Sequence, residues 1–129
     1  MTEVKKLTKV ALIVDAIIWL IFGILLVFLF DVTLNTEGWT NPLHVRMFGG
    51  LCLVSFIFSV YMLLRKEWEE IRITFVYMIF MCTSVLIIEI AVLAMLGSTF
   101  LPATVSQMIL DFIILGAKIT LSIIAYIRQ

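Results

Sequence analysis

The chain has 129 residues, of which 64% are hydrophobic and 14% are charged, and its nine basic and nine acidic side chains give a formal net charge of zero. Its mean hydropathy is +1.22, whereas apolar residues make up only about half of a typical soluble domain. The composition therefore predicts an integral membrane protein, and a balanced charge argues against nucleic acid as a partner.

Four apolar runs are each long enough to cross a hydrocarbon core of about 30 Å, which takes roughly 20 helical residues. In chain order they cover residues 7–30, 44–64, 71–96 and 103–127. Each run is continuously apolar without alternation, which favours helices over the strands of a barrel. The first run is too long for a signal peptide and has no small-residue cleavage pattern, so we expect it to be retained. We predict an all-α fold with one domain over residues 1–129, an integral membrane four-helix bundle.

Basic residues flank mainly one end of this predicted bundle. The N-terminus, the second connection and the C-terminus carry seven of them: Lys5, Lys6, Lys9, Arg65, Lys66, Arg72 and Arg128. Only Arg46 flanks the opposite end. Because positively charged connections stay in the cytoplasm, we predict a multi-pass protein of the cell membrane with both termini cytoplasmic.

A proline leads into the second run and into the fourth, Pro42 and Pro102. Proline suits the first turn of a helix, where its missing N–H would be unpaired anyway, and Asn41 is a suitable cap for the second helix. The second run also carries a stripe of small residues, Gly49, Cys52, Ser55 and Ser59. Such a stripe allows helix backbones to approach closely, either inside the bundle or at a dimer seam.

Apart from Lys9, His44 and Arg72 at their ends, the predicted spans contain five charged residues. A charge inside a bilayer costs from roughly 3 to more than 10 kcal/mol and therefore turns inward and pairs. Counting 1.5 Å per residue from the helix ends places these five residues in two tiers. The inner tier holds Asp15 and Lys118, and the outer tier holds Arg46, Glu89 and Asp111. We predict that Asp15 pairs with Lys118, and that Arg46 pairs with Glu89, Asp111 or both.

The two tiers differ in their charge balance. Asp15 and Lys118 neutralise each other, which favours a structural role for the inner tier. The outer tier has one acid more than its base can neutralise, so a structural role and a proton-binding role both stay open. His44 lies next to this tier at the predicted interface, where a solvated imidazole is the expected state.

Trp19 is deeper than the interfacial belts and lies one turn from Asp15. Its indole N–H needs an acceptor, and we expect it either to fill the core or to form the wall of a ligand cavity. The two cysteines, Cys52 and Cys82, lie in apolar runs without CxxC spacing or a nearby histidine. They are therefore expected to be small buried hydrophobes, and neither a metal site nor a cofactor is predicted.

Three functions fit these features, and none is an enzyme, since no nucleophile and base or metal cluster is spaced recognisably. The leading prediction is a non-enzymatic accessory or scaffold subunit that packs with another membrane protein in the lipid bilayer. The first alternative is a proton- or cation-linked transporter or channel acting as a homodimer, in which Glu89 and Asp111 bind the ion beside Arg46. The second alternative is a site for a lipid, quinone or other amphiphile, lined by Trp19 and the methionines.

Overall fold

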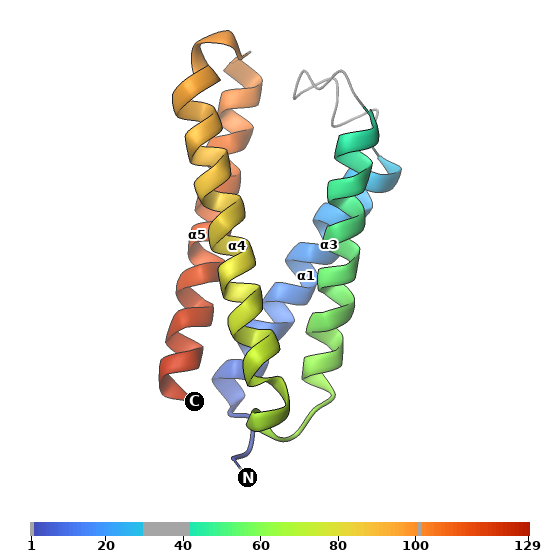
Figure 1. Ribbon diagram of the computed structural model, residues 1–129, viewed down its shortest axis with the longest axis vertical. Coiled ribbons are helices and arrows are strands. Elements are labelled where there is room, and N and C mark those ends of the chain that lie inside the picture. Colours follow the sequence, from blue (N-terminus) through green and yellow to red (C-terminus); the bar gives the residue numbers. More distant parts are fainter. Residues whose placement is uncertain (1, 30–41, 101) are drawn as a thin grey trace.

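The computed structural model describes residues 2–29, 42–100 and 102–129 (Figure 1). Its elements are the helices α1 (Lys6–Phe28), α3 (Pro42–Leu63), α4 (Trp68–Leu96) and α5 (Pro102–Arg128), with a short 3₁₀ turn, η1 (Gly97–Thr99), after α4. All four helices are long and apolar enough to cross a membrane. The predicted all-α fold of four such helices is confirmed, and its bounds differ from the expected ones by three residues or fewer.

The ends of the helices follow from residues visible in the sequence. Helices α3 and α5 begin at Pro42 and Pro102, as their fixed φ and missing N–H predict, while Asn41 lies outside the described residues. The first turn of α4 carries Glu69 and Glu70, and the last turn of α5 carries Arg128. These charges have the signs that the helix dipole favours at each end.

The helices associate as two pairs. α1 packs most extensively on α3 and α4 packs on α5, while α1 also contacts α5, and α3 and α4 share the fewest contacts of these neighbours. Figure 1 shows the two pairs close together at one end and diverging toward the other. We call the first the terminal end, because it carries residues 2–5, 64–67 and Gln129, and the second the loop end.

The stripe of small residues on α3 is an internal packing face. Gly49, Cys52, Ser55 and Ser59 are all buried. A Cβ added at Gly49 would lie 2.8 Å from the Cβ of Leu26 and 3.0 Å from the backbone nitrogen of Val27 on α1. Only glycine permits this approach of the two backbones, so the stripe joins α3 to α1 and is not a dimer seam.

The terminal end is tied together by hydrogen bonds between distant parts of the chain. The Val4 N–H donates to the Lys66 carbonyl at 2.9 Å, which joins the N-terminal segment to the connection between α3 and α4. The side-chain oxygen of Gln129 accepts from the Lys5 N–H at 2.9 Å and from the Thr8 hydroxyl at 2.7 Å. These hydrogen bonds therefore hold the start of α1 and the end of α5 together.

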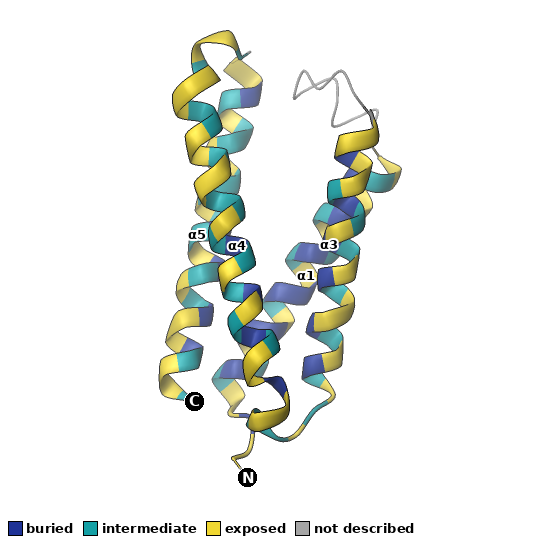
Figure 2. Ribbon diagram, viewed as in Figure 1, coloured by how far each residue is buried: buried dark blue, intermediate teal, exposed yellow. Residues whose placement is uncertain are grey.

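Burial is concentrated at the terminal half of the molecule (Figure 2). The 29 residues of α4, all of them described, include just four buried ones, Ile71, Phe75, Met78 and Cys82. From residue 83 to the end of α4 every side chain is exposed or half-buried. The loop half of this helix is thus only partly covered by the rest of the described chain.

Candidate functional site

The inner charges form a buried ion pair between the first and last helices. Asp15 of α1 and Lys118 of α5 approach to 2.5 Å between Oδ1 and Nζ, and their side chains are 6% and 2% exposed. A charge buried to this extent is stable only beside an opposite charge, so burial of one member of the pair requires the other. The predicted pair of Asp15 with Lys118 is confirmed.

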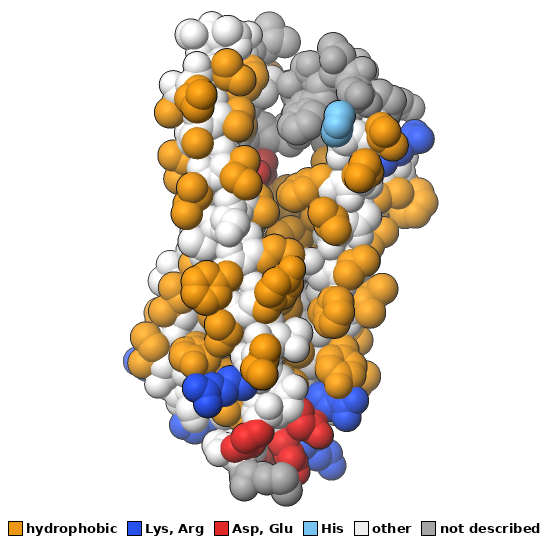
Figure 3. Space-filling model, in the orientation of Figure 1, with side chains coloured by type: hydrophobic (Ala, Val, Ile, Leu, Met, Phe, Trp, Pro, Cys, Tyr) orange, Lys and Arg blue, Asp and Glu red, His pale blue; other side chains and the backbone are white. Residues whose placement is uncertain are grey.

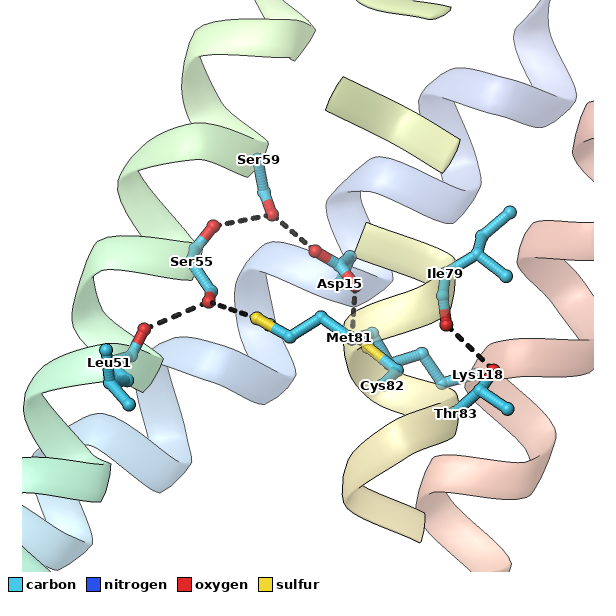
Figure 4. A network of polar contacts seen from close by, with 9 residues as sticks. All are labelled: Asp15, Leu51, Ser55, Ser59, Ile79, Met81, Cys82, Thr83 and Lys118. Atoms are coloured by element: carbon cyan, nitrogen blue, oxygen red, sulfur yellow. Dashed lines mark hydrogen bonds and ion pairs between the residues drawn. The ribbon is translucent and has the colours of Figure 1, made fainter. Parts of the chain in front are cut away.

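Each member of the pair has further partners, and together they come from all four helices (Figure 4). The Ser59 hydroxyl of α3 lies against Oδ2 of Asp15 and 3.0 Å from the Ser55 carbonyl. The Lys118 ammonium lies 2.7 Å from the Cys82 sulfur of α4. Because buried charges are stable only when their remaining hydrogen-bonding capacity is used, these neutral groups complete the cluster of Asp15, Ser59, Cys82 and Lys118, which we call the inner cluster.

Trp19 forms one wall of the inner cluster through its ring face. The side chain is 2% exposed, and the Lys118 Nζ lies 4.0 Å from its ring centroid. A desolvated contact between an ammonium and an indole contributes about 2 kcal/mol. The indole N–H is buried near the Asp15 carboxyl, but it forms no hydrogen bond of acceptable geometry within the described residues. Trp19 thus serves the cluster mainly through its π-system.

The space beside the inner cluster is too small for a substrate. A cavity of about 10 Å³ adjoins Asp15, Cys82, Lys118 and Ser122, and a single water requires roughly 10 to 15 Å³ by this measure. Trp19 does not line this cavity, and its role as the wall of a ligand cavity stays a prediction. The inner cluster is a closed polar junction that fixes the four helices against one another.

The outer-tier residues are distributed over both helix pairs. Arg46 and His44 are exposed near the start of α3. Glu89 of α4 is half-buried, with its Oε2 atom shielded from solvent, and Asp111 of α5 is also half-buried. Ion pairs join Asp15 to Lys118 and Arg65 to Glu70. Pairing of Arg46 with Glu89 or Asp111 stays a prediction.

The two tiers lie at different levels of the diverging helix pairs. At the level of the inner cluster α1, α3, α4 and α5 all contribute a side chain, but toward the loop end the pairs separate (Figure 1). Arg46 lies on one pair, and the two acids lie on the other. The depth of a residue along its helix, which the sequence supplies, says nothing of this lateral separation.

The sequence analysis missed the roles of Ser59 and Cys82. Ser59 had been assigned to the small-residue stripe, and Cys82 had been interpreted as a buried hydrophobe. A hydroxyl or thiol in an apolar run carries no charge that demands a partner, so neither gives a strong signal. The four-residue steps from Ser55 to Ser59 and from Met78 to Cys82, which continue each buried helix face, are the available hint.

The described residues contain no group of three or more His, Cys, Asp or Glu side chains placed to hold a metal ion. The two cysteines are buried and unbridged. Comparison with protein-family models, with curated proteins and with solved structures finds nothing that matches this chain. Its own geometry is therefore the basis for a functional assignment.

Proposed function

We propose that this protein is a non-enzymatic accessory subunit whose α4 and α5 helices pack against another membrane protein at the loop end. The single observation that carries the proposal is the burial pattern of α4. Its terminal half packs inside the bundle, whereas its loop half has no buried side chain. A helix that leaves the bundle in this way presents a long apolar face to other spanning helices.

A polar residue near this face supports a protein neighbour over lipid alone. Asp111 lies in the loop half of α5, is half-buried, and forms no ion pair among the described residues. Inside a bilayer a carboxyl group is costly unless it contacts a donor, and polar contacts between helices stabilise their association. The partner helix would therefore carry a basic or hydroxyl side chain at the depth of Asp111.

The closed inner cluster also supports a structural role. Its charges balance, its cavity is water-sized, and its members hold all four helices. A rigid terminal half that supports two diverging helices is an arrangement suited to holding a partner, because little ordering is needed on binding.

A photo-crosslinking residue at Ile88 tests this assignment, with Ile73 as the matched position. Both are exposed isoleucines of α4, at 61% and 82%, but Ile88 lies in its loop half and Ile73 in its terminal half. We expect one product of defined mass from Ile88 alone, lost in the Asp111→Leu variant. Crosslinking at neither position would refute the proposal, and a product of twice the chain mass would instead support a homodimer.

The transporter alternative makes a separate prediction. If Glu89 and Asp111 carried a proton or cation, the purified protein in liposomes would show a flux that Glu89→Gln or Asp111→Asn abolishes. An accessory subunit shows no flux by itself. A flux that depends on these acids would therefore contradict the accessory role.

We further propose that both termini are cytoplasmic. The support is the basic charge at the terminal end, where Lys66 is exposed and Arg128 ends α5. Labelling intact cells with an impermeant maleimide tests it through Lys66→Cys and Leu43→Cys, both at exposed positions. We expect labelling at position 43 in intact cells and at position 66 only after permeabilisation, and the reverse pattern would invert the topology.

A further inference from the structure

A second cavity lies at the seam between α3 and α4, and Met78 lines both this cavity and the small one beside the inner cluster. The volume of the second cavity is about 150 Å³. The lining comes from successive turns of both helices and includes Leu51, Val54 and Phe58 of α3 and Tyr77, Met78 and Met81 of α4. Several of these side chains are strongly exposed, Leu51 by 62% and Tyr77 by 66%. The cavity is therefore a groove that opens on the outer surface of the bundle, and we call it the seam groove.

The seam groove exists because its two helices barely touch. α3 and α4 follow each other in the chain, yet α3 packs mainly on α1 and α4 mainly on α5. Side chains that meet across the seam are flexible or small, such as Met81 and Ser55. Methionine adapts its shape to irregular apolar contents, so this lining can close around a chain of variable form.

The chemistry of the lining selects an apolar occupant. The Ser55 hydroxyl already donates to the Leu51 carbonyl at 2.9 Å and lies 3.9 Å from the Met81 sulfur. A polar ligand would thus gain few hydrogen bonds and would lose its own solvation. Burial of an apolar chain against this mainly apolar lining is favourable, since it adds dispersion contacts without leaving polar groups unpaired. In a helix bundle that crosses a bilayer, the hydrocarbon available at this surface is a lipid acyl chain.

A basic side chain lies where the groove approaches the terminal end. Tyr61 lies three residues after Phe58 on the same face of α3. Arg65 lies in the connection just beyond the end of α3 at Leu63. The Arg65 guanidinium lies 4.5 Å from the Tyr61 ring centroid. Its contact with Glu70 is long, 3.9 Å, and both side chains are more than 40% exposed, so donors of the guanidinium face outward. Figure 3 shows basic and acidic side chains gathered at this end, next to the hydrophobic surface.

We propose that the seam groove binds one phospholipid with an anionic headgroup, one acyl chain lying along the groove and the phosphate at Arg65. Arginine is suited to this role because its planar guanidinium donates two parallel hydrogen bonds to a phosphate. The adjacent Lys66 is exposed and adds attraction for a negative lipid surface. The proposal is independent of the accessory role, since the groove lies on α3 and α4 in the terminal half and the partner surface lies at the loop end.

Native mass spectrometry of the protein released from nanodiscs tests the proposal. The discs contain phosphatidylglycerol and phosphatidylcholine in equal amounts, and the readout is the lipid retained per chain. We expect one retained phosphatidylglycerol on the unmodified protein. Val54→Trp fills the groove and should lower retention at least tenfold, whereas Arg65→Gln should remove the preference for the anionic lipid, a loss of about tenfold.

Two matched variants separate these effects from general ones. Ile113→Trp adds the same bulk at a 63% exposed position of α5, and Arg128→Gln removes a basic residue from the same end of the bundle. Both should retain lipid as the unmodified protein does. If Val54→Trp is not monodisperse, Leu51→Phe narrows the same groove and replaces it.

Three outcomes would overturn the proposal. Unchanged retention in the groove-filling variant would show that the lipid lies elsewhere. Equal retention of both lipids by the unmodified protein would remove the role of Arg65. Glycerol phosphate competing as well as the whole lipid would show a phosphate site without an acyl-chain groove.

Discussion

Removal of the base from the inner cluster is the most direct test of how this bundle is stabilised. In Lys118→Met the Asp15 carboxyl keeps the Ser59 hydroxyl but loses its counter-charge, and it remains 6% exposed. Breaking a buried pair from one side costs about 3 to 5 kcal/mol, because the remaining charge stays buried. Asp15→Asn is expected to cost less, about 1 to 3 kcal/mol, since the amide oxygen still accepts and Lys118 keeps Cys82 and the Trp19 ring.

The double variant decides whether the two residues act together. With Asp15→Asn and Lys118→Met combined, no charge is left in the cluster, so the total cost should fall below the sum of the single costs by about 1 to 3 kcal/mol. The assay is reversible unfolding in mixed micelles by a denaturing detergent, followed by tryptophan fluorescence. Lys66→Met, at an exposed lysine, is the control and should change stability by about 0.5 kcal/mol or less. A cost below about 1 kcal/mol for Lys118→Met, or additivity of the two changes, would refute the reasoning.

Three further outcomes can be measured in the same micelles. Gly49→Ala should destabilise by about 1 to 3 kcal/mol because its Cβ meets α1, whereas Gly50→Ala, which meets nothing within 4 Å, should stabilise by up to about 1 kcal/mol; equal effects would contradict the close approach. Ser59→Ala should cost about 1 to 2 kcal/mol through the lost contact with Asp15, while Ser84→Ala, at an exposed serine bonded only within its own helix, should be nearly neutral. Both buried cysteines should react with maleimide only at detergent concentrations that unfold the bundle, and fast reaction before that point would show an open core.

Much of the fold could be predicted because it depends on position along the helix axis, which the sequence gives directly. Apolar length fixes the spans, proline fixes the starts of α3 and α5, and depth along the helix places Asp15 level with Lys118. The cost of a buried charge then requires that these two residues meet. Depth along the helix and opposite charge were therefore enough to predict that Asp15 pairs with Lys118.

The rest of the site depends on lateral geometry, which these patterns do not contain. Asp111 and Arg46 lie on helix pairs that diverge toward the loop end, and the depth of a residue does not give the distance between those pairs. The seam groove is equally invisible in the sequence, since it results from α3 preferring α1 over its neighbour in the chain. Trp19 was expected to need an acceptor for its N–H, yet its ring face carries the main contact, with Lys118.

The ion pair between the first and last helices also orders the biogenesis of the chain. α1 and α3 can pack through Gly49 as soon as both have left the ribosome, but Lys118 arrives only with the final helix. Until then the carboxylate of Asp15 lacks the base that it meets in the folded bundle. Neutralisation of α1 therefore waits for α5, and a chain without α5 would have to bury this carboxylate unpaired or leave it in water.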